Sequence, residues 1–235
     1  MFILGHSQID CIREAAEARG MDLPSVDLWQ FENIVVLDES GRRLNDALRD
    51  QLDDFSVSVI GGGDHHVLGL VENDVPFDFV LPQAQHLPLV EGATIVPYDQ
   101  VRATLTEMST PGFDTLHFMQ KVAPKRVVHL TPPPILRDER PINHPIWIAR
   151  VGPCQTVTPP YFRLKLYLLF MEILREVCDQ EGVLLLPLPP GTVDEEGFML
   201  PRFAGRPCHT NQLYGEKVLE QLEEIANLPL EKITR

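Results

Sequence analysis

Residues 2–20, FILGHSQIDCIREAAEARG, decide the expected fold, because a short apolar run passes through a turn directly into an amphipathic stretch. Residues 2–4 are the apolar run. Over residues 8–19 apolar side chains recur at the spacing of one helix face, and Gly20 is typical of a helix end. A strand followed at once by a helix is the repeating unit of a parallel sheet covered by helices.

The same alternation continues along the chain. Apolar runs that suit buried strands lie at residues 34–37, 55–60, 126–130 and 183–188, and helical stretches at 44–52, 161–178 and 211–226. We therefore predict an α/β fold in three layers, a parallel sheet of about five strands with helices on both faces. Sites in such sheets form beyond the carboxyl ends of the strands, so the loops that follow the strands are where we expect function.

The length of 235 residues suits one domain covering residues 1–235. Two Pro-rich segments, near 72–100 and 135–160, follow no regular period. We interpret them as insertions that serve either as a lid or as a partner surface.

Composition excludes several classes of protein. With 20 Lys and Arg against 34 Asp and Glu, the net charge of −14 argues against binding to nucleic acid or to anionic membranes. The most apolar stretch, residues 164–174, is too short and too charged to span a bilayer. The start has no secretory signal, and the four cysteines form no CxxC pair, so we expect a cytoplasmic protein with free thiols. The oligomeric state is not indicated.

Ser7 lies between the first predicted strand and the first predicted helix. A serine there is often a helix N-cap. The same position also suits a nucleophile, because a helix N-terminus offers backbone N–H groups to a developing oxyanion. The sequence leaves both roles open.

A glycine-rich turn, residues 61–66 with the sequence GGGDHH, follows the third predicted strand. It lacks the Lys-Ser or Lys-Thr of a phosphate-binding loop. A metal site built from Asp64, His65 and His66 is one hypothesis, but adjacent histidines on a strand point to opposite faces and rarely bind one ion. A set of His6, Asp64, His65 and His209 is the other metal hypothesis, and zinc needs at least three well-placed ligands. We therefore predict no metal.

In the order and spacing of these features, the chain resembles the SGNH (GDSL-type) hydrolases over nearly its whole length, and it is similar to a divergent member of that family. The matching features are Gly5-His6-Ser7 after the first strand, Gly41 after the second, Gly61-Gly62-Gly63-Asp64 after the third, Thr131-Pro132-Pro133-Pro134 after the fourth, and His209-Thr210-Asn211 before the last helix, preceded by Asp194 to Gly197 and followed by Tyr214-Gly215. The resemblance implies a flavodoxin-like sheet. It also implies that Ser7 attacks an ester carbonyl while His209 takes the proton, without a cofactor.

For the oxyanion hole the resemblance implies the N–H groups of Ser7 and Gly41 and the backbone of Gly62 and Gly63. The family has an Asn donor where this chain has Gly63, so Asp64, His65 or His6 is the expected substitute. The family also has an Asp three residues before its histidine, and this chain has Arg206. Three outcomes are open. Another group orients His209, such as a backbone carbonyl or an acid from residues 194–196; or Arg206 binds an anionic part of the substrate; or His209 is held loosely and the protein turns over very slowly.

The expected function is a serine-dependent ester hydrolase or acyl-transfer enzyme acting on a small-molecule ester, with O-acylated carbohydrate as one candidate. The alternative is a catalytically degenerate protein of the same fold that binds a ligand or partner without hydrolysis. The departures at Gly63 and Arg206 favour the alternative, and the presence of both Ser7 and His209 opposes it.

Overall fold

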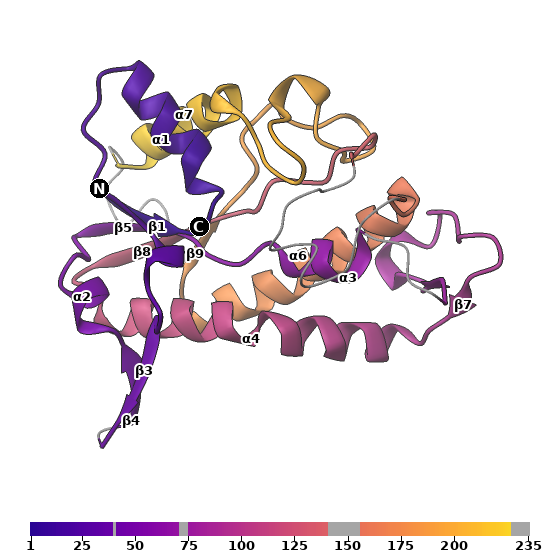
Figure 1. Cartoon of the computed structure of the whole chain (residues 1–235), viewed down its shortest axis with the longest axis horizontal. Coiled ribbons are helices and arrows are strands. Elements are labelled where there is room, and N and C mark those ends of the chain that lie inside the picture. Colours follow the sequence, from indigo (N-terminus) through magenta and orange to yellow (C-terminus); the bar gives the residue numbers. More distant parts are fainter. Residues whose placement is uncertain (40, 71–74, 141–155, 227–235) are drawn as a thin grey trace.

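A central β-sheet lies between two layers of helices (Figure 1). The computed structural model describes residues 1–39, 41–70, 75–140 and 156–226. Five parallel strands lie in the order β2 (Ser25–Asp27), β1 (Phe2–Gly5), β5 (Phe55–Val59), β8 (Arg126–Leu130) and β9 (Leu184–Leu186). Counted along the chain, this is the 2-1-3-4-5 order of flavodoxin-like sheets, and the predicted fold class is confirmed.

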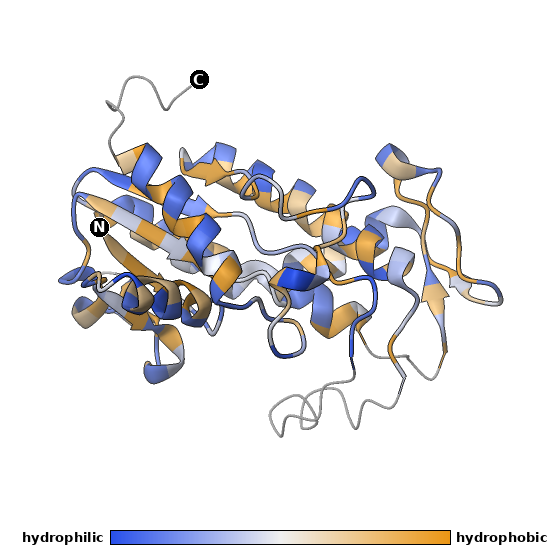
Figure 2. Cartoon of the chain, turned by 90° about the horizontal axis from the view of Figure 1, so that it is seen from above, coloured by the Kyte–Doolittle hydropathy of each residue, from blue (hydrophilic) through white to orange (hydrophobic). Residues whose placement is uncertain are grey.

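Helices cover both faces of the sheet. The helices α1 (Ile9–Ala18) and α7 (Gln212–Ala226) lie together on one face, and α4 (Tyr98–Val122) and α6 (Pro160–Glu181) lie on the other (Figure 1). The first strand alternates accordingly, because Ile3 belongs to the core under α1 and α7, whereas Phe2 and Leu4 belong to the core under α4 and α6. Coloured by hydropathy, the helices carry alternating polar and apolar bands along their ribbons, as expected of helices with one buried face (Figure 2).

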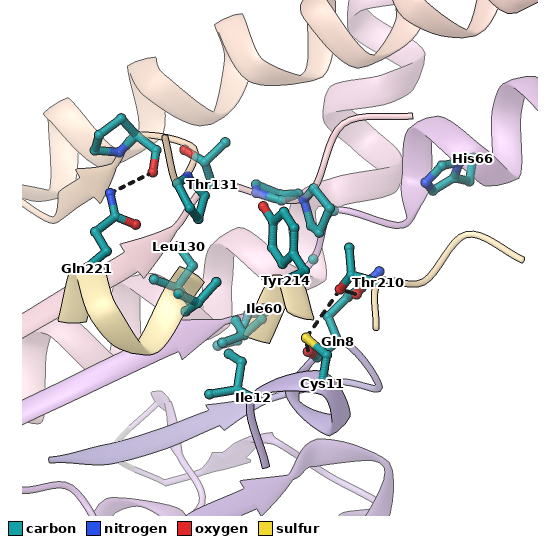
Figure 3. Close-up of a pocket in the computed structure, with 18 residues that line it drawn as sticks. Gln8, Cys11, Ile12, Ile60, His66, Leu130, Thr131, Thr210, Tyr214 and Gln221 are labelled. Carbon is teal, nitrogen blue, oxygen red and sulfur yellow. Dashed lines mark hydrogen bonds between the residues drawn. The ribbon is translucent and has the colours of Figure 1, made fainter. Parts of the chain in front are cut away.

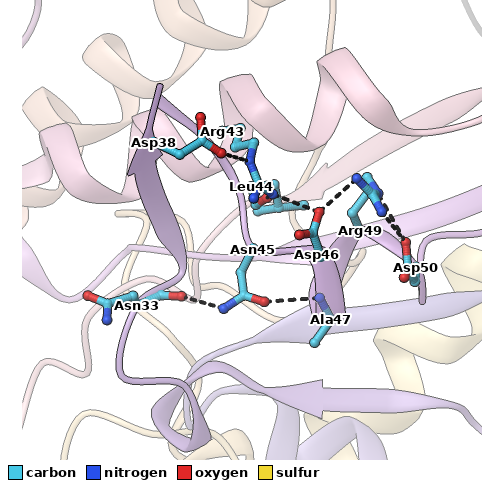
Figure 4. Close-up of polar contacts among 9 residues, drawn as sticks. All are labelled: Asn33, Asp38, Arg43, Leu44, Asn45, Asp46, Ala47, Arg49 and Asp50. Atoms are coloured by element: carbon cyan, nitrogen blue, oxygen red, sulfur yellow. Dashed lines mark hydrogen bonds and ion pairs between the residues drawn. The ribbon is translucent and has the colours of Figure 1, made fainter. Parts of the chain in front are cut away.

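Residues 34–37 do not form a strand of the central sheet, so that prediction is wrong. They belong to a separate antiparallel hairpin of β3 (Val35–Asp38) and β4 (Gly41–Leu44), which extends away from the sheet before the short helix α2 (Asp46–Arg49) (Figure 1). Arg43 secures this hairpin through ion pairs with Asp38 at 2.5 Å and Asp46 at 2.6 Å (Figure 4). Leu37 is 78% exposed, so the apolar run lacks the burial that a central strand requires.

Within the described residues, the sequence pattern does not predict the helices α3 (Asp64–Gly69) and α4, and α4 contains Pro111 in its interior. In the first Pro-rich segment the described residues form β6 (Phe77–Asp78), the 3-10 turn η2 (Pro82–Ala84) and β7 (Thr94–Ile95). Residues 71–74 and 141–155 of the two Pro-rich segments lie outside the described residues. Two further 3-10 turns are η1 (Leu28–Gln30) and η3 (Pro201–Phe203).

A buried ion pair fastens the first Pro-rich segment to the body of the protein. Lys165 of α6 lies 2.5 Å from Asp78 of β6, and the two side chains are 1% and 0% exposed. The carboxylate of Asp78 also accepts hydrogen bonds from the backbone N–H groups of Phe79 and Val90. Among the described helices, none is long and apolar enough to cross a membrane.

Candidate active site

Ser7 and His209 come from opposite ends of the chain and meet at the carboxyl edge of the sheet. Ser7 lies between β1 and α1, and His209 lies in the turn before α7. The Oγ atom of Ser7 is 2.8 Å from Nε2 of His209. Ser7 is not the N-cap of α1, because that position belongs to Gln8, whose side chain makes no cap bond. The hydroxyl of Ser7 contacts the ring of His209 instead.

A backbone carbonyl orients the ring of His209. Its Nδ1 atom lies 2.8 Å from the carbonyl oxygen of Pro207. A carbonyl oxygen only accepts hydrogen bonds, so Nδ1 carries the proton and Nε2 is left with a lone pair toward Ser7. Of the alternatives predicted for orienting His209, the backbone carbonyl is the one that the structure shows.

The turn of residues 206–209 is itself held in place. The N–H of His209 donates to the carbonyl of Arg206 at 2.9 Å, and the side-chain amide of Gln8 donates to the carbonyl of Cys208 at 2.8 Å. Cys208 has a φ of 59°, which L-residues other than glycine rarely adopt, and it is the one described non-glycine residue with a positive φ. A strained backbone directly beside His209 is typical of a functional site.

Arg206 does not reach the substrate side of this turn, which corrects its predicted role. Its guanidinium is exposed and pairs with Asp10 of α1 at 3.1 Å. The residues that line the cleft beside Ser7 do not include it.

The cleft beside Ser7 and His209 has a volume of about 420 Å³. Loops after three of the central strands, together with α3, α4 and the turn before α7, contribute its lining of His6, Ser7, Gln8, Trp29, Gly61, Gly62, Gly63, Asp64, His66, Val67, Met108, Pro111, Gly112, Cys208 and His209. Trp29 is 56% exposed and contacts His6 edge-on, with 5.0 Å between the ring centroids. Asp64 accepts a hydrogen bond from Ser109 of α4 at 3.0 Å.

The glycines of the expected oxyanion hole separate into two groups. Gly62 and Gly63 line the cleft, and Gly62 combines a φ of +78° with a close approach to Pro132, whose side chain lies 2.7 Å from where a Cβ would stand. Gly41 instead lies in the β3–β4 hairpin and is absent from the cleft lining, so its predicted role as a donor is wrong. The second strand of the sheet is followed by η1, and Trp29 of η1 occupies the rim of the cleft.

The two adjacent histidines lie in different surroundings. The side chain of His65 is 2% exposed and packs against Tyr167 and Phe170 of α6, which overturns its predicted place in the oxyanion hole. Burial lowers the pKa of His65 well below its usual value. Among the described residues, no three metal-ligating side chains lie close enough together to hold a metal ion. His65, which belongs to both hypothetical metal sites, is buried in the core. His66 does line the cleft, and sequence reasoning did not select it.

A second Ser–His pair shows that a short distance alone does not make a site. Ser58 of β5 and His129 of β8 are also 2.8 Å apart, but they are 0% and 1% exposed in the interior of the sheet. Burial lowers the pKa of His129 to about 4, so this histidine stays neutral. Only the pair of Ser7 and His209 combines the contact with an open cleft among the described residues.

Behind the cleft, a narrow and mostly apolar pocket of about 30 Å³ lies between α1, α7 and the loops that follow β5, β8 and β9 (Figure 3). Tyr214 stands in this pocket, and its buried hydroxyl has no hydrogen-bond partner among the described residues. Gln8, Gly61, Gly62 and His66 line both the pocket and the cleft. These four residues therefore form the partition between them.

No known family profile matches the sequence, and no curated protein matches it. Among solved structures, the chain is similar to a GDSL-like lipase from Bacteroides thetaiotaomicron, with 12% identity over 96% of this chain and 85% of that chain and a TM-score of 0.41. It is also similar to a carbohydrate acetylesterase from Sinorhizobium meliloti (11% identity, 96% of this chain, 98% of that chain, TM-score 0.43) and to an aryl esterase from M. smegmatis (12%, 97%, 99%, TM-score 0.43). The assignment of the site rests on the geometry of this chain alone.

Proposed function

We propose that this chain is a serine-dependent ester hydrolase or acyl-transfer enzyme in which Ser7 and His209 act as a dyad. The observation that carries the proposal is the hydrogen-bonded relay from Ser7 through His209 to the carbonyl of Pro207, with 2.8 Å in each contact, at the wall of an open cleft. The relay sets the tautomer of His209 in which Nε2 accepts the proton of the serine hydroxyl.

The reaction would proceed in two steps. Ser7 Oγ attacks the ester carbonyl carbon while its proton moves to Nε2 of His209, and the carbonyl oxygen becomes an oxyanion. The bond between the carbonyl carbon and the alcohol oxygen of the tetrahedral intermediate then breaks. The alcohol leaves with the proton from Nε2, and acyl-Ser7 remains. Water, or a second alcohol in acyl transfer, then gives its proton to Nε2 and attacks the acyl carbon. The second tetrahedral intermediate breaks the bond between the acyl carbon and Ser7 Oγ, and Oγ takes the proton back from Nε2, which releases the acid or the new ester and restores Ser7. No cofactor takes part in these steps.

Backbone amides would meet the oxyanion. The N–H of Ser7 at the start of α1 and the backbone of Gly62 and Gly63 lie at the cleft, where preorganised donors stabilise a developing negative charge. The carbonyl of Pro207 adds no negative charge beside His209. The imidazolium that forms during the reaction therefore has weaker support than a carboxylate would give it.

The alcohol part of the substrate would rest on Trp29. A half-exposed indole at the rim of the cleft offers a flat apolar surface for a bulky alcohol such as a sugar ring. This feature favours an O-acylated carbohydrate over a simple alkyl ester.

A fluorophosphonate probe tests the proposal, because it labels serines that a neighbouring base activates. The wild-type protein should be labelled, and Ser7→Ala should abolish the labelling. Ser58→Ala is the matched control, since it removes the buried Ser–His pair and should leave labelling intact. If folded wild-type protein resists the probe and also leaves 4-nitrophenyl acetate uncleaved, the proposal fails and the degenerate binding protein becomes the better account.

A further inference from the structure

We propose that the imidazole of His66 supplies the side-chain hydrogen bond to the oxyanion in this site. The inference rests on the proposed ester hydrolysis and assigns a donor to it. Backbone amides are the only other donors placed at the oxyanion so far, and Gly63 has no side chain to contribute.

The helix α3 places His66 at the cleft. Consecutive residues on a helix differ in direction by about 100°, so His65 enters the core against α6 while His66 faces the partition between the cleft and the narrow pocket behind it. The side chain of His66 is 8% exposed. The ring of His66 lines the cleft and is not among the described side chains whose buried nitrogens lack a partner, so its N–H can meet a ligand bound there.

The other polar side chains of the cleft are less suited to this task. The amide of Gln8 already donates to the carbonyl of Cys208. Asp64 is only an acceptor when ionised, and it already accepts a hydrogen bond from the hydroxyl of Ser109. His209 is assigned to proton transfer, and His6 packs against the exposed Trp29.

The surroundings of His66 keep its ring neutral. Burial, together with the charges of Arg163 and His209, lowers the pKa of His66 to about 3. A neutral imidazole carries one N–H donor and remains in this state throughout the pH range in which an esterase works. It would therefore stabilise the oxyanion by a hydrogen bond, without competing with His209 for the serine proton.

The test replaces His66 with residues that remove or restore a donor. His66→Leu should lower kcat on 4-nitrophenyl acetate by about 10² to 10³-fold with little change in KM, because the bond forms chiefly in the transition state. His66→Gln, which regains an N–H donor, should recover at least tenfold of that loss. The rate of fluorophosphonate labelling should follow kcat in both variants.

His65→Leu is the matched control, because it makes the same change at the neighbouring residue that faces the core, and its kcat should stay within about twofold of wild type. If the folded His66→Leu protein keeps the wild-type kcat, or if His66→Gln is no better than His66→Leu, the assignment of His66 is overturned. If the wild-type protein is not labelled by the fluorophosphonate, the proposed hydrolysis itself is refuted. The two failures are therefore distinguishable.

Discussion

His209 Nδ1 lies 2.8 Å from the carbonyl oxygen of Pro207, two residues earlier in the same turn. In a Ser-His-Asp triad this place belongs to a carboxylate, which both fixes the tautomer and stabilises the imidazolium. The carbonyl of Pro207 fixes the tautomer of His209 as a carboxylate would. It stabilises the imidazolium less well, because it offers a dipole and no full negative charge. In the proposed dyad, His209 therefore has a weaker electrostatic partner than the carboxylate of a triad.

This arrangement changes what a carboxylate at position 206 would do. The side chain of Arg206 points to Asp10, and Nδ1 of His209 is already occupied. We expect Arg206→Asp to alter kcat/KM on 4-nitrophenyl acetate by less than about threefold, with Arg206→Ala as the control. The lost pair with Asp10 is exposed, so the free energy of unfolding should change by at most about 1 kcal/mol. A tenfold gain specific to Arg206→Asp would mean that the new carboxylate displaces the carbonyl of Pro207.

Trp29 should matter for one part of the substrate only. Trp29→Ala should raise KM for a peracetylated monosaccharide by about fivefold, because contact with an aromatic face contributes on the order of 1 kcal/mol. Hydrolysis of 4-nitrophenyl acetate should stay unchanged. Leu37→Ala, at an exposed apolar residue of the β3–β4 hairpin, is the control and should affect neither substrate. Equal losses on both substrates would place Trp29 in the general structure of the cleft.

Ser7 and His209 can be predicted from the sequence, because their positions follow from regular patterns of strands and helices. The apolar run before Ser7 and the helical spacing after it define a strand, a turn and a helix, and parallel topology then brings His209 to the same edge. The second strand was missed because β2 is only three residues long, whereas the β-branched run at 34–37 suits a strand equally well outside the sheet. The long helix α4 was missed because Pro111 and Gly112 interrupt its pattern.

The remaining features depend on information that residue types do not carry. The partner of His209 is a backbone carbonyl, which every residue possesses, so no side chain in the sequence marks it. The sequence pattern does not single out His66, because on a strand the two adjacent histidines would point to opposite faces. On the helix α3 the same two residues separate into a core residue and a cleft residue.

Acid should destabilise the protein through its buried histidines. The pKa of His129 is lowered to about 4, that of His66 to about 3, and that of His65 well below its usual value, whereas in the unfolded chain each is near 6.5. As the pH falls below about 6.5 the unfolded chain gains these protons and the native state does not, so stability is lost from that point downward. Each histidine adds up to about 1.4 kcal/mol per pH unit to the slope.

His65→Leu isolates one of these contributions. It should reduce the slope of unfolding free energy against pH between about 4.5 and 6 by roughly 1.4 kcal/mol per unit. It should also raise the melting temperature at pH 8, because it removes two buried ring nitrogens that have no partner among the described residues. Urea titrations at a series of pH values measure both effects. An unchanged slope would show that His65 is protonated to the same degree in the native and unfolded states.

The buried pair of Lys165 and Asp78 should be the most sensitive ion pair in the described structure. Lys165→Met removes the positive partner and leaves the carboxylate of Asp78 in a fully buried position, which typically costs about 3–5 kcal/mol. Two backbone N–H groups still bind Asp78, so the loss should fall toward the lower end of that range. The double variant Lys165→Met with Asp78→Asn should be more stable than Lys165→Met alone, because no uncompensated charge remains.

The exposed pair of Lys125 and Asp54 provides the control. Lys125→Met should change the free energy of unfolding by no more than about 1 kcal/mol, because exposed ion pairs contribute little. Urea denaturation of the four proteins, followed by tryptophan fluorescence and circular dichroism, gives the comparison. If Lys165→Met were no more destabilising than Lys125→Met, the segment around Asp78 would have to open to water at little cost, and the buried pair would not be what fastens it to α6.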